Sequence, residues 1–304
     1  MLRTDLALEA KEMYHETAGD MTQLDGVVAT TYEESGIVVT KVEILNEKGS
    51  ASIGKPVGNY ITFEMPEFIS YGFVYFNTVV ELVKRELIKL LPDFKDKKIL
   101  VSGLGNRQIT SDALGPWTID KLIITGHLSL LAPQSLKNLG LIYGVVPGVM
   151  GITGIETADV IKGICEKIHP DVVIAVDSLV SRKTERVATT IQISDTGINP
   201  GSGIGNHRKE ITRDSLGIPV ISIGVPMVVD TLTLAYDTVA SLTDINKNEI
   251  LDKISKKKQG KNASFAVTPK EIDKITTQMA NIISSAINIT FHNISIDEIA
   301  GYIN

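Results

Sequence analysis

The strand-like run Lys98-Ile99-Leu100-Val101 leads into a glycine-rich loop, Gly103-Leu104-Gly105-Asn106, and then into Ser111-Asp112-Ala113-Leu114-Gly115-Pro116. A second apolar run, Val172-Val173-Ile174-Ala175-Val176, is followed directly by Asp177. In an open α/β sheet, ligands bind outside the carboxyl ends of the strands. We therefore expect Asp112 and Asp177 to lie together at this edge of one sheet.

Strands and helices alternate along the chain from residue 97 onward. Strands are expected near residues 98–102, 141–146, 172–176, 189–194 and 219–224, with helical patterns between them. This order predicts an α/β fold with a mostly parallel central sheet and helices on both faces. We expect a single domain over residues 1–304.

The N-terminal third of the chain adds smaller elements. Residues 4–17 and 77–91 are expected to be helical. The runs 36–44 and 58–64 are expected to pair as strands, with Gly, Lys and Pro at 49–58 supplying the turn. Together they predict a small N-terminal β-hairpin subregion, residues 36–65.

Two features are expected towards the C-terminus. The lysine-rich segment 244–264 predicts a solvated, mobile loop. After it, Thr268-Pro269-Lys270-Glu271 predicts the start of the last helix, with Thr268 as the N-cap and Glu271 completing a capping box.

The composition argues against several classes of protein. The chain has 304 residues, of which 43% are hydrophobic, enough for a sizeable core. Its net charge of −6 argues against direct nucleic-acid binding. The single cysteine, Cys165, permits no internal disulfide, suits a reducing compartment and is expected to be a small buried hydrophobic residue. No apolar run reaches the roughly 18 residues of a membrane helix, so we expect a soluble, cytoplasmic protein without a membrane partner.

Two carboxyl groups that share one site do not both ionise easily, and this separates them into an acid and a base. Such a pair is the minimum equipment for hydrolysing a peptide bond without a metal or a covalent intermediate. The residues alone leave open which aspartate takes which role, because a coupled pair titrates as a unit. The histidines form no pair at metal-ligand spacing, so we expect no metal and no cofactor. His127 is a weaker candidate, expected close to the Asp112 segment.

The glycine-rich loops are candidate substrate-binding segments. Their backbone N–H groups are suited to stabilising a tetrahedral intermediate or to close approach of a peptide, although tight loop geometry also explains the glycines. The candidate residues are Gly103, Gly105, Asn106, Gly201, Gly203 and Gly205. Neither loop fits a nucleotide site: Gln108 stands where a dinucleotide fingerprint needs its third glycine, and the second loop lacks the Lys-Ser/Thr ending of a phosphate loop.

Three further acids are weaker candidates. Asp195-Thr196-Gly197 matches the catalytic triplet of pepsin-like proteases. Those enzymes are all-β and use two such triplets, so a local turn aspartate is the better interpretation. Asp230 follows a strand-like run and Glu156 a glycine-rich stretch. Together with Asp112 and Asp177 they predict an acidic cleft.

The chain resembles the germination (spore) protease family of spore-forming Firmicutes almost from end to end. Several long motifs in the same order are far more specific than one short pattern. The motifs are Arg3-Thr4-Asp5-Leu6-Ala7, Gly103-Leu104-Gly105-Asn106, Asp112-Ala113-Leu114-Gly115-Pro116, Pro147-Gly148-Val149-Met150-Gly151, Thr153-Gly154-Ile155-Glu156-Thr157, Ile193-Ser194-Asp195-Thr196-Gly197, Gly201-Ser202-Gly203-Ile204-Gly205-Asn206, Gly217-Ile218-Pro219-Val220 and Val267-Thr268-Pro269-Lys270-Glu271-Ile272-Asp273.

The resemblance implies an aspartic-type endopeptidase that degrades small acid-soluble spore proteins during germination, in the spore core. It implies a fold similar to hydrogenase-maturation endopeptidases and catalytic aspartates at Asp112 and Asp177. It also implies a homotetramer and a zymogen that removes its own N-terminal propeptide. Only Met1 and Leu2 precede Arg3, where the family's conserved start lies. We therefore expect this chain to be close to the mature form or to carry a very short prosegment.

Two alternatives stay open. One is a metal-dependent or metal-sensing maturation-type endopeptidase that uses the same acidic cleft; activity that survives a strong chelator would argue against it. The other is a nonenzymatic nucleotide-binding or regulatory module, which would bind a nucleotide and cleave no peptide.

Overall fold

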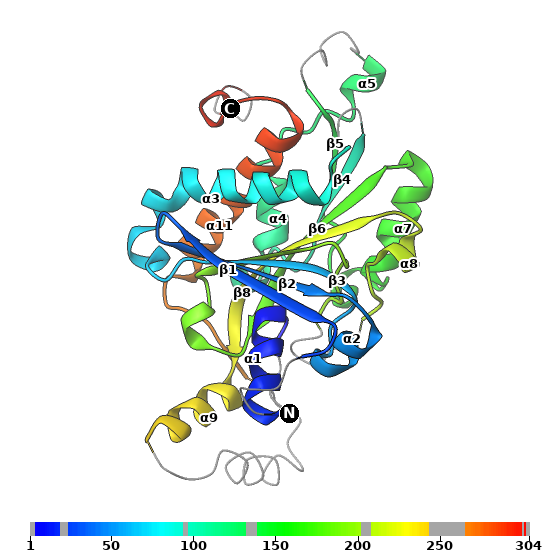
Figure 1. Cartoon of the computed structure of the whole chain (residues 1–304). Helices are drawn as coiled ribbons and strands as arrows, with labels where there is room; N and C mark the ends of the chain where they lie inside the picture. Colours follow the sequence, from blue (N-terminus) through cyan, green and yellow to red (C-terminus); the bar gives the residue numbers. More distant parts are fainter. Residues whose placement is uncertain are drawn as a thin grey trace.

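A mixed β-sheet forms the centre of the protein. The computed structural model describes residues 4–18, 24–93, 97–131, 139–201, 208–242, 265–299 and 301. Over these residues one sheet has the strand order β1-β2-β3-β7-β8-β6-β4-β5, with β9 paired to β8 (Figure 1). The strands are β1 (Val27–Glu34), β2 (Ile37–Ile44), β3 (Gly58–Glu64), β4 (Lys98–Gly103), β5 (Leu141–Val145), β6 (Val172–Ser181), β7 (Thr190–Ser194), β8 (Val220–Asp230) and β9 (Ala266–Val267).

The parallel part of the sheet consists of the neighbouring strands β5, β4, β6 and β8. Continuous apolar runs suit these strands because both of their faces are covered, and residues 172–176 of β6 are almost completely buried. β7, β3, β2 and β1 extend the sheet by antiparallel pairing. The predicted α/β class is confirmed, but the parallel arrangement is confined to the part of the sheet that holds β4 and β6.

Helices lie on both faces of the sheet, as predicted. On one face α3 (Phe68–Leu90), α4 (Leu114–Ile119) and α11 (Ile272–Phe291) pack together over the sheet (Figure 1). On the other face α7 (Thr157–Ile168) and α8 (Arg213–Leu216) cover the parallel strands, while α1 (Ala7–Ala18) and α2 (Glu47–Ile53) cover β2 and β3. The other described helices are η1 (Thr110–Asp112), α5 (Leu128–Leu131), α6 (Met150–Thr153), η3 (Thr184–Arg186), α9 (Thr231–Leu242) and α12 (Ile296–Ile299).

Several local expectations need correction. β2 and β3 pair antiparallel as predicted, but the segment between them holds helix α2, with Asn46 as its N-cap, in place of a simple turn. β1 is an additional strand that joins β2 across Ser35-Gly36, both at positive φ. α11 begins at Ile272 without a side-chain cap, so the predicted capping box does not form. The predicted loop 244–264 lies outside the described residues. Among the described helices, none is long and apolar enough to cross a membrane.

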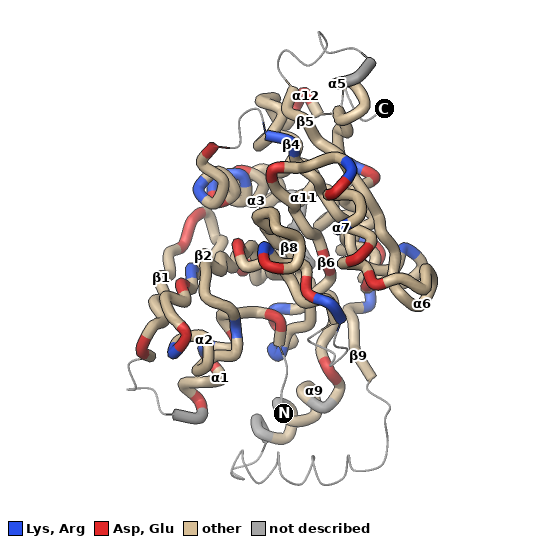
Figure 2. The backbone as a smooth tube through the Cα atoms, turned by 90° about the vertical axis from the view of Figure 1, so that its right-hand side faces the viewer, with Lys and Arg blue, Asp and Glu red and all other residues tan. Residues whose placement is uncertain are grey.

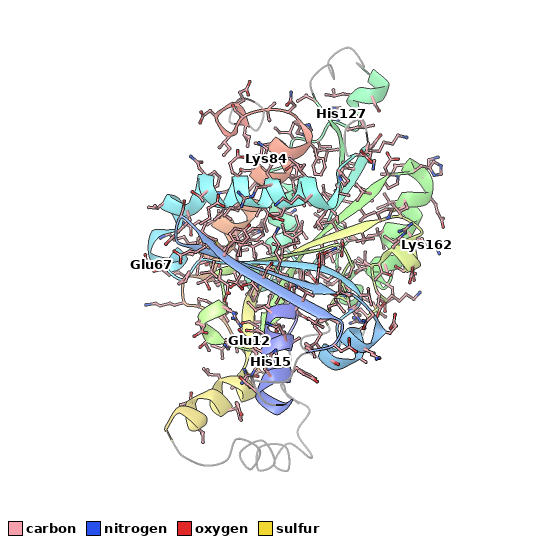
Figure 3. The ribbon with its side chains drawn as sticks, viewed as in Figure 1. Glu12, His15, Glu67, Lys84, His127 and Lys162 are labelled. Atoms are coloured by element: carbon pink, nitrogen blue, oxygen red, sulfur yellow. The ribbon has the colours of Figure 1, made fainter. Side chains whose placement is uncertain are left out.

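Helix α1 is fixed to the rest of the protein by charged side chains. Glu9 is buried and accepts hydrogen bonds from the Arg182 and Lys183 amides, just after β6, at 2.6 and 2.9 Å. Glu12, labelled on α1 in Figure 3, forms a bidentate pair with Arg186, with both N–O distances 2.7 Å. Burial acts to raise the pKa of Glu12, but the Arg186 and Lys183 bonds and charges outweigh it and lower this pKa. The segment that precedes α1 is therefore held close to the end of β6.

Two glycines let α4 lie directly against the carboxyl end of β4 and the neighbouring Val176 of β6. A Cβ added at Gly103 would come within 2.3 Å of the Gly115 carbonyl oxygen. A Cβ at Gly115 would come within 2.4 Å of the Leu104 backbone and 2.5 Å of the Val176 carbonyl oxygen. These contacts are with backbone atoms, which do not move aside as a flexible side chain does. The turn that carries Asp112, which directly precedes α4, is therefore held close to the end of β4 and the middle of β6.

We predict that Gly115→Ala destabilises the fold by about 2 kcal/mol or more, because the added methyl group must displace the backbone of β4 and β6. Gly163→Ala is the matched control. Gly163 lies on the exposed side of α7, where an added Cβ meets nothing within 4 Å, and alanine there should stabilise the helix by roughly 0.5–1 kcal/mol. Urea unfolding should move the midpoint down for the first variant and up for the second; equal midpoints would contradict the tight junction.

Candidate active site

Asp112 is held by the loop that follows β4. It ends the 3₁₀ turn η1, and the Asn106 amide donates to both its carbonyl oxygen and its Oδ2, each at 2.9 Å. Gly105 has a φ of +103°, and a Cβ there would lie 2.0 Å from the Asp112 carbonyl oxygen. Glycine at 105 therefore allows the chain to return this closely. The result is a half-buried carboxylate fixed near the end of β4.

Asp177 lies within β6 and not at its end. The predicted strand stopped at residue 176, but β6 continues to Ser181 because β8 continues beside it, with Asp177 opposite Gly224. β4, in contrast, ends: its last pair with β6 joins Gly103 to Val176. Asp177 is thus the first residue of β6 beyond the end of β4. The prediction of the strand end was wrong, while the expected position beside the carboxyl end of β4 is correct.

Burial and mutual charge set the pKa values of the two carboxyl groups apart. Burial raises the pKa of Asp112 to about 6, and the hydrogen bond from Asn106 opposes this rise. Asp177 is only 6% exposed; burial, followed by the charge of Asp112, raises its pKa well above the usual range. The Ser178 amide, which donates to Asp177 Oδ1 at 2.9 Å, opposes this rise, and the charge of Asp5 adds to it. Of the two groups, Asp177 is thus the more buried, and the charge of its neighbour favours its protonated form.

Both aspartates line one cleft of about 1020 Å³, whose walls include the N-terminal segment, α1, α2 and the ends of β4 and β6. The other charged residues that line it are Asp5, Glu210, Lys55 and Arg208. Asp230 and Glu156 do not line it: the former ends β8, and the latter precedes α7. The cleft is thus lined by a different set of acids from the predicted one, and two bases accompany them. In the view of Figure 2, basic and acidic positions are interspersed along the chain.

The candidate glycine-loop residues divide into three groups. Gly105 and Gly201 line the cleft. Gly103 and Asn106 do not line the cleft: Gly103 is buried against α4, and the Asn106 amide donates a hydrogen bond to Asp112. Gly203 and Gly205 lie outside the described residues. A substrate-binding role stays a prediction for all of them, and among the described ones the cleft position favours Gly105 and Gly201.

Asp195 ties two strands together. Its carboxylate accepts hydrogen bonds from the Asn59 amide at 2.7 Å and from Asn59 Nδ2 at 2.6 Å, which links the end of β7 to β3. It does not line the cleft. Its partner is on a neighbouring strand and not within its own turn, but its role is structural, as expected.

His127 is not brought to Asp112. It is exposed beside α5, at the opposite end of the molecule from α1 and α2, which line the cleft (Figure 3). Within the part of the chain that the structure describes, no group of three or more His, Cys, Asp or Glu side chains is arranged to hold a metal ion.

Two residues that line the cleft, Lys55 and Asp5, were not identified as candidates from the sequence. Lys55 Nζ donates to the carbonyl oxygens of Thr4 and Asp5 at 3.1 and 3.0 Å, and so holds the N-terminal segment in the cleft. Burial lowers the pKa of Lys55, opposed by the charges of Asp5 and Glu9. Asp5 had a signal, because it lies in a motif shared with the resembling family. Lys55 had none, because it stands in a turn without periodicity or motif.

A central sheet flanked by helices, with two coupled carboxyl groups opening into one cleft, has the equipment of a hydrolase. Comparison with known proteins gives the class more closely. The family model described as germination protease matches residues 7–265. The chain belongs to the germination protease family, and it is a peptidase.

The relatives agree over nearly the whole chain. A germination protease of Clostridium perfringens is 42% identical over 325 aligned residues, covering 100% of this chain and 99% of the relative. That of Caldanaerobacter subterraneus is 42% identical over 95% and 93% of the two chains, and that of Bacillus cereus 38% over 96% and 94%. Among solved structures, the hydrogenase maturation protease HycI from Thermococcus kodakarensis matches 63% of this chain and 92% of its own, at 15% identity and a TM-score of 0.35.

We predict that Asp177→Asn stabilises the protein at neutral and higher pH. The pKa of Asp177 is higher in the folded than in the unfolded state, where it is about 3.9. The contribution of Asp177 to the free energy of unfolding is therefore most favourable below about pH 4. It is lost as the pH rises towards the pKa of Asp177 in the folded state. The asparagine does not ionise and still accepts from Ser178, so the variant should be more stable by at least about 1 kcal/mol at pH 8. Urea unfolding at pH 4, 6 and 8 measures this; a difference independent of pH would contradict it.

Proposed function

We propose that this peptidase is an aspartic-type endopeptidase in which Asp112 is the base and Asp177 the acid. The observation that carries the proposal is that the two carboxyl groups line one cleft and differ in burial: Asp177 is 6% exposed, whereas Asp112 is half-buried. Asp112, with a pKa of about 6, is available near neutral pH to take a proton from water. Asp177, whose pKa is raised well above its usual range, keeps a proton to donate.

In the proposed reaction, a water between the two carboxyl groups attacks the scissile carbonyl carbon while Asp112 accepts its proton. Asp177 donates its proton to the carbonyl oxygen, which gives a neutral tetrahedral diol. Collapse of the diol breaks the C–N bond: the nitrogen takes a proton from Asp112, and a diol hydroxyl returns one to Asp177. The products are a carboxylic acid and an amine, and both aspartates regain their initial states. Backbone N–H groups of Gly105 and Gly201 are candidates for orienting the substrate, because both residues line the cleft.

The substrates we propose are small acid-soluble spore proteins, degraded during germination in the spore core. The support is membership of the germination protease family together with a cleft large enough for an extended peptide. Self-processing of a zymogen and a homotetrameric assembly belong to the same proposal and rest on the family resemblance. The metal-dependent alternative is less favoured, because the acid–base pair already supplies both proton-transfer groups.

The direct test is incubation with a small acid-soluble spore protein, with and without a strong chelator, followed by mass mapping of the fragments. We expect internal cleavage that the chelator leaves unchanged. Asp112→Asn and Asp177→Asn should each lower turnover by at least about 10²-fold, because each removes one member of the acid–base pair. Asp195→Asn is the control with the same chemical change outside the cleft, and its loss should be much smaller. Near-wild-type turnover by either dyad variant would overturn the assignment, and loss of cleavage in chelator would favour the metal-dependent alternative.

We also predict a bell-shaped dependence of kcat/KM on pH. The acidic limb should have its midpoint near pH 6, because Asp112 must lose its proton to act as the base. The alkaline limb should report the loss of the proton from Asp177, whose pKa is raised by burial and by the charge of Asp112. Initial rates between pH 4 and 10, with unfolding checked at each pH, provide the measurement. A profile that rises continuously towards low pH would assign the base to a different group.

A further inference from the structure

At Ser178, the edge of β6 on the β4 side has no neighbouring strand among the described residues. Along β6, backbone groups alternate between the two neighbouring strands. The Val173 amide donates to Pro219, on the β8 side, whereas the Val176 carbonyl accepts from Leu104, on the β4 side, at 2.8 Å. By this alternation Ser178 and Val180 also face the β4 side. β4 has ended at that point, because its last paired residue is Gly103.

The ladder stops because its next donor has another partner. In a continued parallel ladder, the bond from Leu104 to Val176 would be followed by one from the Asn106 amide to the Ser178 carbonyl. The Asn106 amide instead donates to the carbonyl oxygen and Oδ2 of Asp112. The Asn106 amide therefore positions Asp112, and for the same reason it is not available to pair with the Ser178 carbonyl. Ser178 lines the cleft, and its own amide donates to Asp177.

The next position on the same edge is occupied by the N-terminal segment. The Asp5 amide donates to the Val180 carbonyl at 2.9 Å, and the Val180 amide donates to Asp5 Oδ2 at 2.9 Å. Asp5 lies in a bend and contacts β6 at this one residue, and Lys55 holds the segment through the Thr4 and Asp5 carbonyl oxygens. Between this segment and the end of β4, the edge at Ser178 faces the cleft beside Asp177.

We propose that the substrate backbone docks on this edge of β6 at Ser178, between Leu104 and Asp5, with one of its backbone amides donating to the Ser178 carbonyl. The inference rests on the proposed peptidase function and specifies how the cleft takes its substrate. This contact uses only backbone groups, so it holds peptides of different sequence at one position and leaves their side chains to contact the walls. Because Ser178 follows Asp177 directly, this position sets the scissile bond beside the acid–base pair.

The competing site is the other short edge near the cleft, at β9. Ala266 of β9 lines the cleft, and β9 pairs with β8 at Val229 and Asp230. A peptide bound there would meet the cleft at a wall formed by β8 and β9, away from the β6 edge that carries Ser178. The two edges therefore predict different labelled residues in a cross-linking experiment.

The first test is a backbone N-methyl scan of a peptide of about ten residues that spans a cleavage site mapped in a small acid-soluble spore protein. Methylation replaces one amide hydrogen and leaves every side chain in place. We expect methylation of one amide close to the scissile bond to lower kcat/KM by at least about 10-fold, and methylation of the two adjacent amides to have a much smaller effect, since those face away from β6. Equal effects at neighbouring positions, or none, would overturn the docking mode.

The second test locates the edge. The peptide carries a diazirine amino acid next to the scissile position and is bound to Asp112→Asn, which keeps it intact. After irradiation, we expect the label on residues 178–180 and Leu104. A label confined to residues 265–267 would overturn the proposal in favour of β9. Cleavage of the unmodified peptide by the wild type distinguishes failure of the proposed function from failure of the docking mode. If neither the mapped protein nor the peptide is cleaved, the proposed function fails and this inference fails with it. If cleavage is normal but the methylation pattern is wrong, only the docking mode is refuted.

Discussion

The Asn106 amide donates a hydrogen bond to Asp112 and not to β6, and the arrangement of the site depends on this choice of acceptor. It ends β4 at the level of Val176 and closes the loop around Gly105. It gives Asp112 a donor that favours its ionised form. It also leaves β6, which β8 continues to support, without a neighbouring strand on the β4 side at Ser178 among the described residues. Base, acid and strand edge therefore share one structural cause.

Two carboxyl groups of this protein, those of Glu12 and Asp177, have pKa values that their surroundings shift in opposite directions. At α1, burial would raise the pKa of Glu12, but Arg186 and Lys183 more than compensate for it. Asp177 has no such basic partner among the groups that shift its pKa; the charges that do shift it, those of Asp112 and Asp5, are negative. An uncompensated buried acid costs stability, and such sites are concentrated where function requires them.

A raised pKa alone does not identify the acid, however. Burial also raises the pKa of Glu9, although its carboxylate accepts from two backbone amides and lies near Arg186. Glu9 is completely buried and does not line the cleft, so it has no access to a substrate. Asp177 combines the raised pKa with a position in the cleft and a second coupled carboxyl group. It is this combination that supports its role as the acid.

The sequence predicted those parts of the fold that depend on local pattern. The parallel strands were found because strands covered on both faces are continuous apolar runs, and the aspartate pair followed from the rule that sites lie at strand ends. The length of β6 could not be predicted, since it depends on β8 beside it. Nor could β1, whose burial alternates weakly along a polar sequence. The packing of Gly103 against Gly115 could not be predicted, because it is a tertiary contact, and the roles proposed for the two aspartates depend on burial that no spacing reveals.

The carboxyl groups of an acid–base pair must be shielded from water and yet remain accessible to the substrate. Asp177 must be dry enough to keep its proton, yet its carboxyl group must reach a peptide bond. A substrate docked on the edge of β6 would satisfy both demands, because the peptide itself would cover the pair as it binds and exclude water other than the reacting molecule. Further desolvation raises the pKa of a buried carboxyl group, so binding would strengthen the hold of Asp177 on its proton. The hydrogen bond from Asn106 would act in the opposite direction at Asp112 and keep it ionised. Asp177 is already only 6% exposed before a substrate binds, so the substrate would mainly cover Asp112, and the hydrogen bond from Asn106 is what would keep Asp112 the base.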